Sequence, residues 1–333
     1  DEGEGGAAKK AAEEMLAEQA HQEFQLWAKH RCRKERAAFW FRKCAEKGHS
    51  GGQYELGLYY RAGYEASAHP LETGSMPLPR RDDLAADWFD SAAKQAHPQA
   101  QLEYAICLLS GSGVDKDEAK GFQWLQKSAQ EGVMVAVFQM GVCYEQGRGT
   151  LTDPPQAVSH FREAATHLVV DAMVALARCL ERGFGAPKDE REAVAWYRKA
   201  SDRNPSAMYL LGRALQEGRG AERDEIRAVE LYLAAAHHHH DLAPLQIGVS
   251  YQHGIGVPRD EAEALRWFMR GAERGNADAM LHVALSFSTG LGTTEDLERY
   301  RWWLGRAAEA GNEKAAKMVA LQHPARLKGR GGV

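Results

Sequence analysis

The hydrophobic residues of this chain follow a helical pattern that starts again about every 36 residues. Each period holds two stretches whose apolar positions recur at three- and four-residue spacing, which indicates two amphipathic helices. In the stretch 134–146, Met140, Gly141 and Tyr144 fall on one face, and the same order of large, small and large returns in other periods. The pattern therefore predicts helix pairs that pack closely, because the small residue leaves room for a neighbouring helix.

One pair of residues marks the second helix of each period: an aspartate, then a tryptophan seven residues later. The pair is complete at Asp117/Trp124, Asp189/Trp196, Asp260/Trp267 and Asp296/Trp303. His160 and Leu231 replace the tryptophan in two copies, and the copies with Trp40 and Trp88 lack the aspartate. The eight positions 40, 88, 124, 160, 196, 231, 267 and 303 are separated by 48, 36, 36, 36, 35, 36 and 36 residues. This period predicts a solenoid in which each unit packs on its neighbours.

The recurring residues have structural roles in this interpretation. A glycine is expected to end each first helix in the left-handed conformation. Each aspartate is expected to cap the second helix, which contributes about 1 kcal/mol. The tryptophan is expected to fill the space between units. The glycines recur as Gly-x-Gly, but no strand precedes them and no Lys-Ser/Thr follows, so a phosphate-binding loop is disfavoured.

Composition supports a helical, globular chain. Of the 333 residues, 44% are hydrophobic and 26% are charged, and proline is sparse. The net charge of −4 gives no general electrostatic reason to bind nucleic acid. No apolar run approaches the roughly 20 residues of a membrane span. The sequence starts without an initiator methionine, so a targeting segment would not be visible in it.

The period divides the chain into three parts. Residues 1–33 read as a flexible acidic start followed by an N-terminal capping helix, and residues 34–322 hold the repeats. Within them, residues 63–81 contain a 12-residue insertion, which is expected to be a surface loop and is either a binding element or merely tolerated. Residues 323–333 form a basic tail that could contact an acidic partner or RNA, or could simply be solvated.

The cysteines favour a reducing compartment. Cys107, Cys143 and Cys179 stand 36 residues apart, at one position of successive repeats. Stacked helices lie about 8–10 Å apart, whereas a disulfide needs Cα atoms within about 7 Å. These three are therefore expected to be free and buried. Asn204 is followed by proline, so the chain has no usable N-glycosylation sequon. Cytoplasm or mitochondrion is favoured over the secretory pathway.

The combined motif resembles the Sel-1-like repeat, a relative of the tetratricopeptide repeat. It reads Leu-Gly-x-x-Tyr-x-x-Gly-x-Gly-Val, then Asp-x-x-x-Ala-x-x-Trp-x-x-x-Ala-Ala-x-x-Gly. The resemblance implies an all-α, right-handed α/α superhelix (solenoid) of about eight helix-pair repeats of 36 residues, whose concave face binds proteins or peptides within larger assemblies. Some secreted bacterial members carry a cysteine pair in each repeat, and a few bind or slowly cleave β-lactams. Cys44 stands near one half of such a pair, but the partner position is not cysteine.

Candidate partner-binding residues lie beside the packing positions of the first helices and at the end of the insertion. The set is Glu103, Gln139, Arg178, Arg213, Gln246, His282, Arg80 and Arg81. Arg178 and Arg213 stand at equivalent positions of adjacent repeats. They could form a ladder for the carboxylates of a partner, or they could be solvated surface charges.

A run of four histidines, His237, His238, His239 and His240, replaces the usual turn between two repeats. Neutral imidazoles suit nickel or zinc, so adventitious metal binding is expected. A functional metal site is not, because adjacent positions on one turn do not all converge on one ion. No cofactor is expected.

No catalytic motif emerges from the sequence. It contains no His-Glu-x-x-His, Gly-x-Ser-x-Gly, Cys-x-x-Cys or Walker loop. The leading hypothesis is a non-enzymatic scaffold or adaptor for protein or peptide partners. The alternative is a structural subunit embedded in a large assembly, such as an organellar ribosome or a respiratory complex. A weak β-lactam hydrolase is a third hypothesis.

Overall fold

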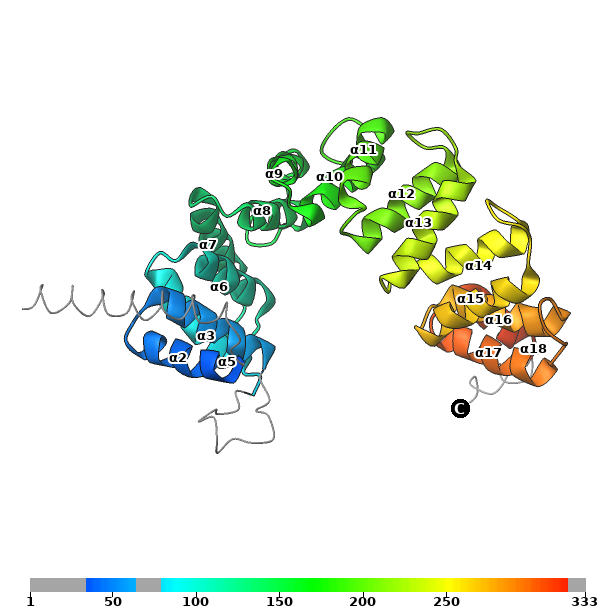
Figure 1. Cartoon of the computed structure of the whole chain (residues 1–333), viewed down its shortest axis with the longest axis horizontal. Helices are drawn as coiled ribbons and strands as arrows, with labels where there is room; N and C mark the ends of the chain where they lie inside the picture. Colours follow the sequence, from blue (N-terminus) through cyan, green and yellow to red (C-terminus); the bar gives the residue numbers. More distant parts are fainter. Residues whose placement is uncertain (1–33, 64–78, 323–333) are drawn as a thin grey trace, which may run out of the picture. The chain divides into compact units, whose positions relative to one another are not determined.

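The computed structural model describes residues 34–63 and 79–322 (Figure 1). The expected N-terminal capping helix, most of the insertion and the basic tail lie outside these residues. Regular structure in the described ranges is entirely α-helical, which confirms the all-α solenoid class. The helices are α2 (Lys34–Glu46), α3 (Ser50–Ala62), α5 (Asp82–Lys94), α6 (Pro98–Ser110), α7 (Glu118–Gln130), α8 (Met134–Gln146), α9 (Pro154–Thr166), α10 (Val170–Arg182), α11 (Glu190–Ala200), α12 (Pro205–Glu217), α13 (Glu225–His237), α14 (Ala243–His253), α15 (Glu261–Glu273), α16 (Ala277–Thr289), α17 (Leu297–Glu309) and α18 (Glu313–Gln322).

The described helices form two compact units that divide between residues 169 and 170, and within each unit every helix packs against the next one along the chain. The first helices of the repeats are α3, α6 and α8 in one unit and α10, α12, α14, α16 and α18 in the other. Side chains join several consecutive first helices directly. Arg61 of α3 pairs with Glu103 of α6, and the Asn312 amide at the start of α18 donates to Asp278 of α16 at 2.7 Å. We call these two sets of helices the first-helix layer of each unit.

The capping aspartates join the two helices of a repeat. Asp224 Oδ1 accepts the backbone N–H of Arg227 at 2.9 Å, and the N–H of Asp224 itself donates to the carbonyl of Leu215 in the first helix at 3.0 Å. The expected caps are confirmed at Asp117, Asp153, Asp189, Asp224, Asp260 and Asp296. One residue thus begins the second helix and fastens it to the end of the first.

The two glycines of each Gly-x-Gly loop have different roles. Gly218 ends α12 in the left-handed conformation, with φ 69°, as expected. Gly220 shares that φ, but a Cβ there would lie 2.0 Å from the carbonyl oxygen of Glu190, in the first turn of the preceding second helix. Four other loops make the same contact: Gly113 with Asp82, Gly149 with Glu118, Gly256 with Glu225 and Gly292 with Glu261. The second glycine therefore lets the backbones of successive repeats touch.

The expected role of the tryptophans is wrong in one respect. The described copies other than Trp40 are half-buried, and Trp40 itself is 47% exposed. The residue after each position of the tryptophan column is buried: Phe41, Phe89, Leu125, Phe161, Tyr197, Tyr232, Phe268 and Leu304. Leu231, which replaces the tryptophan in one copy, is buried as well. The Phe89 ring lies where Gly57 lacks a side chain, since a Cβ at Gly57 would be 2.5 Å from it. The small residue of the first helix leaves a space that faces the second helix. The residue after the tryptophan fills this space, and the indole remains at the surface.

The tryptophans instead carry cations on their outer faces. Lys127 Nζ lies 4.0 Å from the centre of the Trp124 ring, and Lys199 Nζ lies 4.2 Å from Trp196. In both pairs the cation follows the tryptophan by three residues on the same helix, which brings the two side chains together. Such contacts contribute about 0.5–1 kcal/mol at exposed sites.

The cysteine prediction is confirmed for the three stacked positions. Cys107, Cys143 and Cys179 are buried and free, as is Cys44. Burial raises the pKa of Cys107 and of Cys143 to about 11, so both stay protonated at neutral pH. None of the described helices combines the length and apolar character that spanning a bilayer requires.

Replacing the two loop glycines by alanine separates backbone strain from close packing. Gly218→Ala and Gly220→Ala both impose the left-handed cost of about 1–2 kcal/mol. Only Gly220→Ala adds a collision with backbone, which costs about 1–3 kcal/mol more. We expect the lower melting temperature for Gly220→Ala. Equal melting temperatures for the two variants would show that the contact between repeats tolerates a methyl group.

A second comparison tests which aromatic residue holds the repeats together. Phe89→Ala empties a buried slot, so it should lower the free energy of unfolding by about 3–5 kcal/mol. Trp88→Ala removes a half-buried ring and should cost less. Urea denaturation of the two variants measures the two losses in free energy of unfolding. A larger loss for Trp88→Ala would show that the tryptophan contributes more to the packing between repeats than Phe89 does.

Candidate interaction surfaces

Five of the predicted partner-binding residues are half-buried in the first-helix layers: Glu103, Gln139, Arg213, Gln246 and His282. Glu103 pairs with Arg61, and Gln246 hydrogen-bonds to the Tyr209 side chain of the preceding first helix. The ring of His282 stacks on Phe268 at 4.5 Å between centroids and 16° between planes. Glu103 and Gln246 therefore join repeats, and only part of each surface is left for a partner.

Arg178 and Arg213 are in different electrostatic situations. The Arg213 guanidinium donates to Glu181 at 3.2 Å, and Arg219 donates to the same carboxylate oxygen at 2.5 Å. The Tyr197 hydroxyl donates to the other oxygen of Glu181 at 2.9 Å. Burial alone would raise the pKa of Glu181, but the Tyr197 hydrogen bond and the two arginines lower it overall. Arg213 is thus held inside a charged cluster.

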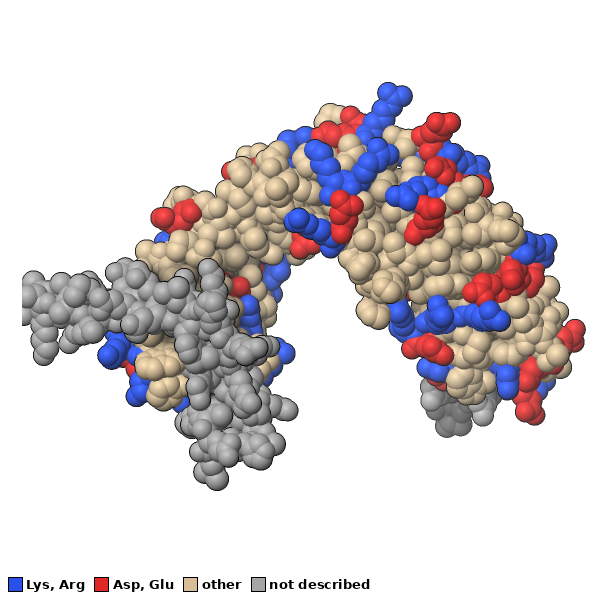
Figure 2. Space-filling model, viewed as in Figure 1, with Lys and Arg blue, Asp and Glu red and all other residues tan. Residues whose placement is uncertain are grey.

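Arg178 is exposed and makes no ion pair within the described part of the chain. It still lies near the same cluster, because its positive charge acts on the Tyr197 hydroxyl together with that of Arg213. Figure 2 shows basic and acidic side chains intermixed on the viewed face of the molecule. The structure therefore brings the two arginines of the predicted ladder to one cluster and leaves one of them without a carboxylate.

The arginines at the end of the insertion pair with the helix that follows them. Arg80 Nε lies 3.1 Å from Asp82 and Arg81 Nη2 lies 2.6 Å from Asp83, all on the surface. Exposed pairs of this kind contribute little to stability. A partner could therefore compete for both arginines at small cost.

The four histidines of the turn after α13 point to different neighbours. His237 and His238 make an edge-to-face contact with 5.6 Å between centroids. His239 Nδ1 lies 3.3 Å from Arg274 Nη2, and His240 stacks on Tyr209 at 4.6 Å. No group of three metal-ligating side chains gathers among the described residues. His160, in the tryptophan column, is half-buried and stacks on Tyr144 at 5.5 Å.

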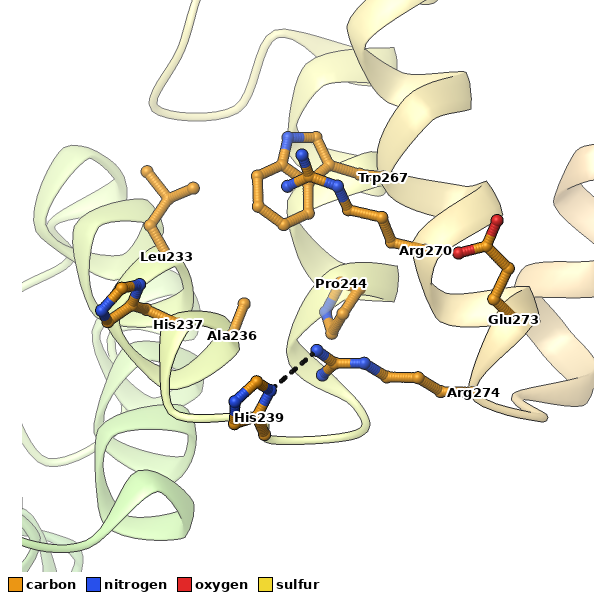
Figure 3. A pocket seen from close by; sticks show the side chains of 9 residues that line it. All are labelled: Leu233, Ala236, His237, His239, Pro244, Trp267, Arg270, Glu273 and Arg274. Atoms are coloured by element: carbon orange, nitrogen blue, oxygen red, sulfur yellow. Dashed lines mark hydrogen bonds between the residues drawn. The ribbon is translucent and has the colours of Figure 1, made fainter.

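This turn also borders a pocket of about 520 Å³ between α13, the start of α14 and α15 (Figure 3). Its lining includes Leu233, His239, Trp267, Arg270 and Arg274. Comparison of equivalent repeat positions predicted that Trp267 packs between units and that the histidines form a turn. It did not predict that Trp267, His237 and His239 line one pocket. The replacement of the usual turn by histidines was the available signal.

Comparison with known families decides what kind of protein carries these surfaces. The family model described as Sel1 repeat matches residues 34–49, 71–97, 98–133, 135–167, 170–204, 205–240, 243–276 and 277–312. The chain belongs to the Sel1 repeat family. Sel1 repeat proteins generally mediate protein–protein interactions and are typically non-enzymatic scaffolds, so protein partners are implied. Comparison with curated protein sequences gives no match.

Two solved Sel1-type structures are similar over most of this chain. A Sel1 repeat protein from Oxalobacter formigenes is 27% identical with a TM-score of 0.66, covering 94% of this chain and 89% of its own. A protective antigen present in uropathogenic Escherichia coli strains, which displays an SLR fold, is 25% identical with a TM-score of 0.68. That match covers 87% of this chain, which spans 60% of the antigen's length.

Histidine also occurs at the start of the first helix of some Sel1 repeats. His97 Nδ1 accepts the backbone N–H of Ala100 at 3.2 Å, and the His97 ring stacks on Tyr54 at 4.9 Å. Asn204, Asn276 and Asn312 cap α12, α16 and α18 in the same way. Burial lowers the pKa of His97 below its ordinary value of 6.5. Protonation would remove the lone pair that accepts the cap hydrogen bond.

The depressed pKa makes the cap sensitive to acid. The unfolded chain binds a proton at His97 more readily than the folded chain does, so the stabilisation is present above about pH 6.5 and is lost below it. His97→Asn keeps a capping side chain and removes the titration. We expect the wild type to lose more melting temperature than His97→Asn between about pH 7.5 and about pH 5.5. An identical loss in both would remove His97 from the acid response.

Proposed function

We propose that this chain is a non-enzymatic scaffold or adaptor that binds an acidic protein or peptide segment along its first-helix layer, the face expected to be concave. The observation that carries this proposal is Arg178. It is exposed on the first-helix layer without a carboxylate partner among the described residues, next to a cluster that holds Arg213 in place. A guanidinium of this kind can accept a bidentate carboxylate from a partner.

The spacing of the layer suits an extended peptide. Neighbouring helices lie about 8–10 Å apart, and an extended chain advances about 3.3–3.6 Å per residue. Side chains of an extended chain alternate between its two sides, so acidic residues two apart face the same way at a separation of about 7 Å. Such a pair could reach both Arg178 and the outer side of Arg213. Glu181 fixes Arg213 beforehand, so little conformational entropy is lost there on binding.

A structural role within a large assembly is the second candidate, and the exposed apolar side chains of α17 and α18 favour it. Leu297 and Trp302 of α17 are 57% and 54% exposed, and Leu321 of α18 is 80% exposed. Exposed apolar side chains of this kind can be covered by another subunit. The four buried free thiols are consistent with either role in a reducing compartment such as the cytoplasm or mitochondrion.

Charge reversal at Arg178 tests the scaffold proposal. The tagged full chain and the variants Arg178→Glu and Arg191→Glu would be used to capture partners from source cells, quantified by mass spectrometry. Arg191 is exposed on the second helix α11 and controls for the change in charge. Loss of a charge-assisted hydrogen bond worth about 1.5–3 kcal/mol should reduce recovery of direct partners about ten- to hundredfold for Arg178→Glu alone.

Arg213→Glu is unsuitable for the same test, because it would place a carboxylate beside Glu181 and lower stability. Gel filtration of the purified chain addresses the second candidate. A stable monomer favours the adaptor, whereas aggregation in isolation favours an obligate subunit. Unchanged recovery with Arg178→Glu would contradict binding along the first-helix layer.

A further inference from the structure

The pocket beside the histidine turn combines an apolar wall with a basic one. Leu233 of α13 lies on one side, and Trp267 and Arg270 of α15 lie on the other with Arg274, which directly follows that helix (Figure 3). Pro244, at the start of α14, lies between the two sides. The pocket lies mostly on second helices and on a turn between repeats. It is therefore separate from the surface around Arg178.

The charges at the pocket are not balanced by their neighbours. Arg270 lies over the Trp267 ring, with its guanidinium carbon 4.4 Å from the ring centre. Neither Arg270 nor Arg274 forms an ion pair with a carboxylate of the described chain, unlike Arg259 and Arg266 nearby. Glu273 also borders the pocket, but its carboxylate points away from His239 and Arg274 in Figure 3. Two guanidiniums thus border the pocket without a carboxylate partner among the described residues.

His239 adds a donor to this basic wall. Arginine carries only donors, so the contact between Arg274 and His239 Nδ1 makes Nδ1 the acceptor. The proton of the neutral ring is then on Nε2. Arg274 Nη1 also donates to the backbone carbonyl of His240 at 3.5 Å. The Nε2–H of His239 and the N–H groups of Arg274 outside these two contacts remain for an anion.

The backbone of His239 shows that this arrangement has a cost. His239 has φ 63°, in the left-handed region, and the equivalent turn position is glycine in four other repeats, at Gly48, Gly132, Gly275 and Gly311. Ala96 and Leu168 take the same conformation at this turn position in two other repeats, so the strain alone does not mark a binding site. His239 brings an imidazole next to Arg274, whereas a glycine at this position would leave Arg274 without that neighbour.

We propose that this pocket binds an acidic peptide segment of a protein partner. A carboxylate of the segment lies against Arg274 and His239, and an adjacent aliphatic side chain packs on Leu233, Pro244 and the exposed part of Trp267. Arg270, one helical turn before Arg274, receives a second acidic side chain. Carboxylates match the planar fork of arginine, and the apolar wall requires that the anion be carried on a chain with hydrophobic residues.

The proposal is tested with short fluorescein-labelled peptides in which a central leucine is flanked by glutamates, added to the full chain. Fluorescence anisotropy at low ionic strength should detect binding that weakens as salt is added. Arg274→Glu should weaken it at least tenfold. Arg266→Glu, the same charge reversal on the same helix outside the pocket, should change it less than twofold.

His239→Gly distinguishes a binding role from a structural one. The substitution removes the imidazole and relieves the strain, so it should weaken peptide binding at least threefold while leaving the melting temperature equal or higher. A merely structural histidine would show no loss of binding. Replacement of the peptide's leucine by glycine should also weaken binding.

Several results would overturn the proposal. These are no binding by the wild type, equal effects of Arg274→Glu and Arg266→Glu, or no effect of the leucine replacement. Binding of a phosphoserine peptide in place of the glutamate peptide would contradict the carboxylate specificity. Arg178→Glu should leave this peptide's affinity unchanged, so failure here and failure of the first-helix proposal are separable.

Discussion

The contact on which the described fold depends is a backbone-to-backbone approach at the second glycine of five of the loops within repeats. Gly220 lies so close to the carbonyl of Glu190 that no side chain fits between them. This contact sets the distance between successive repeats. The capping aspartate, which begins the second helix and also bonds to the first, sets the geometry inside each repeat.

These two constraints explain the arrangement of the aromatic residues. Once the helices of a repeat are fixed, a glycine or alanine of the first helix leaves a slot that one ring can enter, as Phe268 does opposite Gly248. The neighbouring Trp267 is then directed to the surface, where Arg270 covers its face. Phe268 thus belongs to the core, and Trp267 belongs to the surface that a partner can contact.

Much of this architecture could be predicted from the sequence, because the period places each role at a fixed position. The helix pairs, the aspartate caps and the free buried cysteines are as expected. The burial of Tyr197 in place of Trp196 was not foreseen, since both are aromatic and differ by one position on a helix. Resolving them requires knowing which face meets the small residue of the first helix, and that depends on the crossing of the two helices.

The candidate sites were less accessible to sequence reasoning. Arg178 and Arg213 stand at equivalent positions, yet Glu181 captures only Arg213, because the contact spans two repeats. The pocket beside α13 gathers residues from a turn and three helices, and no column of the repeat contains them all. Sequence periodicity describes what the repeats share, so it is least informative where one repeat differs from the rest.

The turns between repeats behave differently from the loops within them. A Cβ added at Gly48, Gly132, Gly275 or Gly311 would meet nothing within 4 Å, whereas one at Gly220 would strike backbone. Other repeats already place Ala96, Leu168 and His239 at this turn position with positive φ. One side chain per turn can therefore be varied there at the left-handed cost of about 1–2 kcal/mol. This turn position thus tolerates substitution in successive repeats without a change in the packing of the helices.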